Sequence, residues 1–158
     1  LHHVLPSLLS CCVCRNMCLR PETDNHWALR DFSAKTLVGL VRDQVDKRDH
    51  GFTARRLFDF AYRTFRDPAS SSAMIYGTIH ILQEFIGESN KKPTWLLAEF
   101  AETSRRCKTI IDAANRLNTN LSVSEAGKLH QQIIKAEGII RTRHNIASTV
   151  VPLNRRYP

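Results

Sequence analysis

Cysteine and histidine side chains near the start of the chain are the first candidates for chemistry. Cys11, Cys14 and Cys18 recur at three- and four-residue spacing, so they would share one face of a helix, and His26 is the only later donor close by. Such donors could bind zinc, but the usual two pairs of ligands separated by a longer loop are absent. Buried thiols that pack as small apolar side chains are the interpretation we favour. We therefore expect no bound metal and no cofactor.

The rest of the sequence carries no recognisable enzyme motif. It has no phosphate-binding Walker loop, no dinucleotide glycine fingerprint and no Gly-x-Ser-x-Gly elbow. The seven histidines are scattered rather than paired with acids at ligand spacing. His26 beside Trp27 has the look of a site residue, but a capping or packing role is more common at a helix start. We expect a protein that is not an enzyme and has no small-molecule substrate.

Positive charge is concentrated in the last third of the chain. The formal net charge is +8, and from residue 91 onward 12 Lys and Arg residues stand against 5 Asp and Glu residues. If these side chains converge, they could neutralise phosphates in salt-dependent, sequence-independent contact with DNA. An acidic protein partner or an ordinary solvated helix surface would account for the same charge. The candidate contact residues are Arg105, Arg106, Lys108, Arg116, Lys128, Lys135, Arg141 and Arg143.

The composition indicates one helical domain in a reducing compartment. A chain of 158 residues with 42% hydrophobic residues can form one packed core, and few glycines and prolines, six of each, favour helices. Four of the five cysteines fall between Cys11 and Cys18, which is unlike the spread-out framework of a disulfide-rich secreted domain. No apolar run approaches the roughly 18 residues that a membrane span needs, so we expect no membrane association.

Apolar periodicity predicts six helices joined by short polar loops. The expected ranges are 3–19, 24–45, 52–65, 72–86, 94–117 and 124–146, the last beginning at a capping box over 122–125. Gly77 inside the fourth helix costs about 1 kcal/mol relative to alanine, which indicates close approach of another helix. Three antiparallel pairs fit an all-α solenoid of HEAT-like repeats, with a plain helical bundle as the alternative. We expect residues 1–148 to form this domain and 149–158 to be an extended C-terminal tail.

The second predicted helix organises the rest. Thr23 or Asp24 would cap its start, because a short oxygen side chain accepts hydrogen bonds from the first backbone N–H groups. Its apolar residues recur at helical spacing, which predicts that Leu29 and Phe32 point into the core and that Trp27 lies near the core boundary.

Charged residues on the same helix allow two interpretations. Asp24 and Arg30 are six residues apart, the spacing of the Asp–Arg ladder that links neighbouring HEAT repeats. Trp27, Arg30 and Asp31 could form a partner-binding patch, because Trp and Arg are frequent interface anchors. We favour a packing role, with Arg30 bonded to Asp24 or to a loop carbonyl of the next repeat.

A longer string of residues surrounds this helix. Leu-Pro-Ser-Leu-Leu-Ser-Cys occupies 5–11, Leu-Arg at 19–20 precedes a loop, and Asp-Asn-His-Trp-Ala-Leu-Arg-Asp-Phe-Ser-Ala occupies 24–34. In this order they closely resemble the C-terminal HEAT domain of the TFIID subunit 6 family over roughly residues 4–41. A weaker resemblance continues through Tyr76-Gly77. The resemblance singles out Asp24, His26, Trp27, Arg30, Asp31 and Tyr76 as partner-binding or inter-repeat packing residues.

The resemblance implies a nuclear, non-enzymatic scaffold that acts in assembly of the RNA polymerase II preinitiation complex. Other TFIID subunits would be its partners, and in some organisms it would be shared with a SAGA-type coactivator. In that family a separate histone-fold region, absent from this chain, pairs with TFIID subunit 9. Sequence-independent nucleic-acid binding through the basic C-terminal helices is the alternative function.

Overall fold

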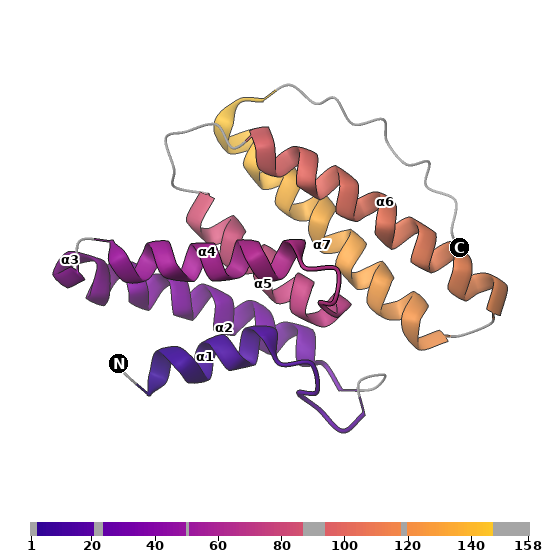
Figure 1. Cartoon of the computed structure of the whole chain (residues 1–158), viewed down its shortest axis with the longest axis horizontal. Helices are drawn as coiled ribbons and strands as arrows, with labels where there is room; N and C mark the ends of the chain where they lie inside the picture. Colours follow the sequence, from indigo (N-terminus) through magenta and orange to yellow (C-terminus); the bar gives the residue numbers. More distant parts are fainter. Residues whose placement is uncertain (1–2, 21–23, 50, 87–93, 118–119, 147–158) are drawn as a thin grey trace.

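The computed structural model describes residues 3–20, 24–49, 51–86, 94–117 and 120–146, and within these ranges it contains helices and no strand (Figure 1). The helices are α1 (Val4–Val13), α2 (His26–Leu40), the π-helical turn η1 (Val41–Val45), α3 (Asp46–Asp49), α4 (Phe52–Arg66), α5 (Ser72–Ile86), α6 (Thr94–Leu117) and α7 (Asn120–His144). The predicted all-α fold is confirmed. The tail predicted for 149–158 and the loop over 87–93 lie outside the described residues. Within the described ranges, none of the helices combines the length and apolar character that crossing a bilayer requires.

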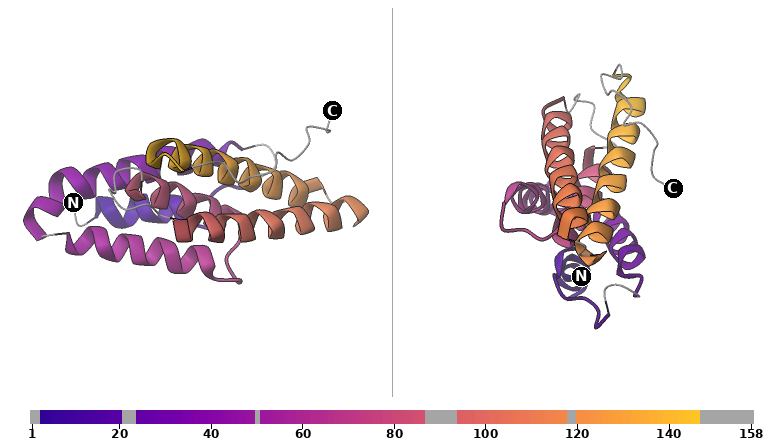
Figure 2. Two further views of the ribbon diagram at one scale, coloured as in Figure 1. Left: turned by 90° about the horizontal axis from the view of Figure 1, so that it is seen from above. Right: turned by 90° about the vertical axis from the view of Figure 1, so that its right-hand side faces the viewer.

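In the described part of the chain, the helices form three antiparallel pairs, α1 with α2, α4 with α5, and α6 with α7 (Figure 1). The second helices of the pairs also contact one another, because α5 lies between α2 and α7 and packs against both. Seen from above, α2 and α7 lie on one side of the molecule and α4 and α6 on the other (Figure 2). This is the predicted α-solenoid, in which each pair covers its neighbour.

Helix α5 forms the centre of the core. Its sequence is apolar around most of its circumference, and such a helix must be covered on several sides. Ile79, Ile81 and Leu82 are fully buried there, beneath α2, α4 and α7. On the other side of the molecule, Phe65 of α4 meets Phe100 of α6 edge to face, with 5.6 Å between ring centroids. Neighbouring pairs therefore share a continuous apolar interior.

The buried side of α2 differs from the predicted one. Leu29 is 44% exposed and Phe32 is 65% exposed, so their predicted place in the core is wrong. The side that faces α1 and α5 instead contains Arg30, which is fully buried, together with Leu37 and Val38. The prediction used the apolar residues of α2 alone. Because Arg30 was not counted among the buried residues, the predicted core-facing side of the helix was rotated toward Leu29 and Phe32.

Three helix boundaries also differ from the predicted ones. Helix α1 ends at Val13 rather than near residue 19, which leaves Cys14 and Cys18 outside it. Asn25, not Asp24, caps α2, and its side-chain oxygen accepts a hydrogen bond from the backbone N–H of Ala28 at 3.4 Å. Helix α7 already begins at Asn120, so the proposed capping box over 122–125 lies inside a helix.

Gly77 confirms the predicted close approach of another helix. A Cβ atom built on Gly77 would overlap the carbonyl oxygen of Cys12 and lie 2.8 Å from its carbonyl carbon. Glycine is therefore required at this position of α5 for steric reasons, and the C-terminal end of α1 rests directly on the α5 backbone.

Candidate functional site

Arg30 binds the C-terminal end of α1. One terminal guanidinium nitrogen donates a hydrogen bond to the carbonyl oxygen of Cys12 and the other to that of Cys14, each at 2.6 Å. The last carbonyls of a helix have no partner within the helix, and a rigid guanidinium fork can satisfy two of them at once. Burial lowers the pKa of Arg30 below its usual value, but arginine stays charged in proteins. Arg30 therefore acts as a charged cap that α2 supplies to α1.

His26 supports this cap from one turn earlier in α2. The Nε–H of Arg30 donates to Nδ1 of His26 at 3.2 Å. Burial, and next the charge of Arg30, lowers the pKa of His26. The imidazole is thus kept neutral, which leaves Nδ1 free to accept the hydrogen bond. The packing role expected for His26 agrees with this geometry.

The predicted bond between Arg30 and Asp24 is absent. A carboxylate oxygen of Asp24 instead accepts a hydrogen bond from the backbone N–H of Arg20 at 3.2 Å and so closes the turn before α2. The carbonyls that Arg30 reaches lie at the end of α1 and directly after it, within its own helix pair rather than in the next repeat. In this chain the arginine therefore holds one helix pair together instead of forming a ladder between repeats.

The cysteines near α1 do not gather around a common point. Cys12 is fully buried, Cys14 is exposed, and Cys11 and Cys18 are partly buried. Burial raises the pKa of Cys12 to about 12, so this thiol stays protonated. Across the described ranges, no three His, Cys, Asp or Glu side chains are grouped as metal ligands would be. The shared helical face proposed for Cys11, Cys14 and Cys18 is wrong, because α1 ends before the last two.

A second polar cluster links α2 to α5. Nε2 of His80 lies 2.8 Å from a carboxylate oxygen of Asp31, and the side chain of His80 is only 8% exposed. Burial lowers the pKa of His80, with the carboxylate of Asp31 opposing the shift. Burial and the same carboxylate raise the pKa of Tyr76, one turn before His80. Trp27 packs edge-on against Tyr76, with 4.8 Å between ring centroids.

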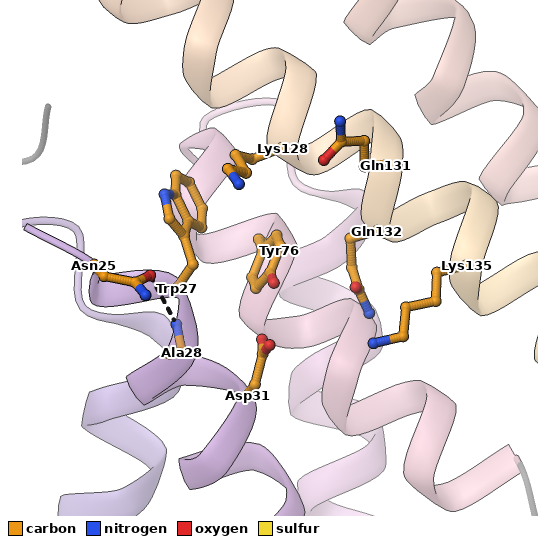
Figure 3. A pocket seen from close by; sticks show the side chains of 9 residues that line it. All are labelled: Asn25, Trp27, Ala28, Asp31, Tyr76, Lys128, Gln131, Gln132 and Lys135. Carbon is orange, nitrogen blue, oxygen red and sulfur yellow. Dashed lines mark hydrogen bonds between the residues drawn. The ribbon is translucent and has the colours of Figure 1, made fainter.

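Trp27, Asp31 and Tyr76 line a pocket of about 310 Å³ where α2, α5 and α7 meet. Figure 3 shows Trp27 and Asp31 on the α2 side, Tyr76 at the back, and Lys128, Gln132 and Lys135 on the α7 side. The lining residues are Asn25, Trp27, Ala28, Asp31, Tyr76, Lys128, Gln131, Gln132 and Lys135. We refer to this cavity as the Trp27 pocket.

A buried hydrogen bond fixes the α7 wall of the Trp27 pocket. The side-chain amide of Gln132 donates to the side-chain oxygen of Gln83 in α5 at 3.2 Å. At the C-terminal ends of both helices, a ring nitrogen of His144 lies 3.2 Å from the carbonyl oxygen of Ile86. Polar contacts at both places therefore hold α7 in register against α5. Nothing in the local sequence pattern indicated His80, Gln83 or Gln132, apart from the four-residue spacing of Tyr76 and His80.

The basic residues proposed for DNA or acidic-partner contact are distributed over several surfaces. Lys128 and Lys135 lie in the Trp27 pocket, next to residues of the family motif. Arg105 instead pairs with Glu102 one turn earlier on α6, at 2.6 Å. Lys108, Arg116 and Arg143 are exposed, Arg141 is partly buried, and the side chain of Arg106 lies outside the described residues. Of the eight candidate residues, the fold therefore brings Lys128 and Lys135 next to Trp27 and Asp31.

Comparison with known proteins identifies the first four predicted helices. Residues 1–93, more than half of the chain, match the model of the TAF6 C-terminal HEAT repeat domain. The chain belongs to this family. Transcription initiation factor TFIID subunit 6 of Drosophila melanogaster is 36% identical over 89 residues, which make up 56% of this chain and 14% of the fly protein. TFIID subunit 6b of Arabidopsis thaliana is 30% identical over 79 residues, 50% of this chain and 14% of the plant protein. No solved structure gives a significant match.

Membership of the TAF6 C-terminal HEAT repeat family confirms the resemblance drawn from the residues of α1, α2 and α5. The matched segment contains the Arg30 cap, Gly77 and the aromatic wall of the Trp27 pocket. Helices α6 and α7 begin after residue 93, so the lysine wall of the pocket lies beyond the match. The Trp27 pocket therefore has one wall in the segment that matches the family model and one wall in the helix pair that follows this segment.

Proposed function

We propose that this HEAT domain is a non-enzymatic scaffold on which TFIID subunits assemble in the nucleus during formation of the RNA polymerase II preinitiation complex. A SAGA-type complex is a second setting in which the same surface would serve. The chain spans 14% of the length of each of the two TFIID relatives, so the proposal concerns the role of the domain within a longer subunit.

The main support for this proposal is that Cys12 contacts two other helices. Its carbonyl oxygen accepts a hydrogen bond from Arg30 of α2, and its backbone lies against Gly77 of α5. One point thus joins three helices from two pairs. Arg30 and His26, which lie in the segment that matches the family model, bond to each other, and Arg30 also bonds the end of α1, which supports a role in fixing the relative placement of the helices. A stiff stack presents surfaces of fixed shape, and partners can dock on it with little ordering cost.

Removal of the domain from the complete subunit tests this function. The affinity-tagged full-length protein and a version lacking these 158 residues would be purified from nuclear extract, and the copurifying TFIID subunits quantified by mass spectrometry. The deletion is expected to lose several subunits but to retain TFIID subunit 9, since that pairing would use a histone-fold region outside this chain. Retention of the full set of subunits would refute the scaffold role.

A further inference from the structure

We propose that the Trp27 pocket is a docking site for an acidic segment of a partner protein, and that α7 supplies its charge selectivity. This inference rests on the scaffold function proposed above and names the chemistry of one partner. The pocket is concave, has an aromatic wall from α2 and α5, and carries two lysines on α7 (Figure 3).

Lys128 and Lys135 form the attractive part of the pocket. They are seven residues apart on α7, which places both on one face of the helix about 10 Å apart along its axis. Three residues of a peptide in the polyproline II conformation complete one turn and span a similar length, about 9 Å, so side chains three positions apart lie on the same side. Both lysines are exposed, and no carboxylate of the described residues is found in an ion pair with either of them. Two peptide carboxylates three positions apart would therefore meet one lysine each.

The carboxylate within the pocket wall does not cancel this attraction. Asp31 is the acidic residue among the lining side chains, and one of its oxygens lies 2.8 Å from Nε2 of His80 in the interior. The carboxylate also acts on the Tyr76 hydroxyl, whose pKa it helps to raise. The Asp31 side chain is 40% exposed and contributes one negative charge to the pocket, but the two lysines outnumber it, so the lining keeps a net positive charge.

The shape and the remaining lining residues favour a peptide over nucleic acid. A volume of about 310 Å³ suits one or two side chains, and the exposed amide of Gln131 is of the type that can hydrogen-bond a peptide backbone. Duplex DNA carries a charge about every 1.7 Å along its axis and binds through broad groups of cations. Glu102, paired with Arg105 on α6, offsets part of the positive charge there.

The two walls of the pocket have different origins. Trp27, Asp31 and Tyr76 lie in the segment that matches the family model, whereas Lys128 and Lys135 lie beyond it. The aromatic wall therefore belongs to the family segment of this chain, and the lysine wall adds a preference for acidic sequences.

A peptide titration with charge-reversed variants tests the proposal. The probe is a fluorescein-labelled peptide of about twelve residues, rich in Asp and Glu with two Phe residues, and the readout is anisotropy. Reversal of both pocket lysines, Lys128→Glu with Lys135→Glu, should weaken binding about tenfold or more, because two ion pairs are lost and replaced by repulsion. The matched control, Lys108→Glu with Arg116→Glu, changes net charge equally on α6 and should cost less than about threefold. Equal losses in both variants would overturn the assignment to this pocket.

Two further measurements locate the ligand and identify its class. The chain has two tryptophans, so in a Trp95→Phe background the emission of Trp27 alone reports on the pocket. Its emission should shift on peptide binding, and an unchanged spectrum at saturation would refute docking there. An unlabelled DNA duplex that displaced the peptide at equal charge concentration would show a nucleic-acid surface instead. Circular dichroism melting of each variant checks that the fold is retained.

The same lysine reversal in the full-length subunit separates this proposal from the scaffold function. If deletion of the domain removes subunits and the Lys128→Glu, Lys135→Glu variant removes at least one of them, both proposals stand. If the deletion removes subunits and the lysine variant removes none, the acidic docking site is refuted while the scaffold stands. If the deletion removes none, the scaffold itself is refuted.

Discussion

Replacement of Arg30 by alanine should destabilise the fold more than any exposed arginine would. The guanidinium satisfies the carbonyl of Cys12 at the end of α1 and that of Cys14 just after it, each at 2.6 Å, and is fully buried, so its removal leaves both acceptors without this donor. Hydrogen bonds to charged groups contribute about 1.5–3 kcal/mol each, and an unsatisfied buried acceptor costs about 1–3 kcal/mol. Release of the buried charge offsets part of the loss. We expect the free energy of unfolding to fall by about 3 kcal/mol.

Urea unfolding followed by circular dichroism measures this loss. With a urea m-value of about 1.5–2 kcal/mol/M for a domain of this size, the midpoint should fall by about 1.5–2 M at unchanged m. Arg30→Lys keeps the charge but reaches fewer carbonyls, so it should fall between the alanine variant and the parent. Arg105→Ala removes a 73% exposed arginine with a surface ion pair and should change stability by less than about 0.5 kcal/mol. A loss below about 1 kcal/mol for Arg30→Ala would refute the capping role.

Three other substitutions test separate contacts. Gly77→Ala should lower the free energy of unfolding by about 1–3 kcal/mol despite the better helix propensity of alanine, because the new Cβ meets the Cys12 backbone. Gly138→Ala, with open space around it, should raise the free energy of unfolding by about 0.5–1 kcal/mol in the same urea assay. A change of the same sign in both variants would refute the close approach. Trp27→Ala should cost about 1–3 kcal/mol in thermal melting through loss of the half-buried ring against Tyr76, and no loss would leave Trp27 as an exposed anchor only. The lowered pKa of His80 means that the unfolded chain binds its proton first, so His80 contributes stability that is full above about pH 6.5 and is lost as pH falls through the folded pKa. Urea midpoints between pH 7.5 and 5.5 should therefore drop on acidification less steeply in His80→Gln than in the parent, and equal slopes would contradict this.

Local sequence rules predicted most helix limits because the signals at those limits are local. The bounds of α5 and α6 agree with the predicted ranges 72–86 and 94–117, where loops rich in proline, serine or charge precede each helix. The early end of α1 at Val13 was missed, since nothing near it breaks a helix as proline or glycine would. Its end is instead held by Arg30, whose guanidinium bonds the carbonyls of Cys12 and Cys14 from 16 to 18 residues away.

The site was less predictable than the fold because its contacts join distant parts of the chain. Hydrophobic periodicity treats arginine as a surface residue, and a fully buried Arg30 therefore shifted the predicted core face of α2 toward Leu29 and Phe32. The family motif pointed to Trp27, Asp31 and Tyr76, but no spacing rule places a lysine on α7, about 100 residues later, beside them. Only the packing of α7 on α5 does so.

One side of α2 holds neighbouring helices in place, and another side lines the Trp27 pocket. On its buried side Arg30 fixes α1, and the neighbouring contact of Gly77 with Cys12 fixes α5 against the same point. On its other flank Trp27 and Asp31 form one wall of the pocket whose opposite wall is α7. A ligand in the pocket would thus contact one helix of each pair and would bind only when the three pairs are correctly stacked. By linkage it should raise the stability of the whole stack, by about 2.7 kcal/mol at a hundredfold excess over its Kd.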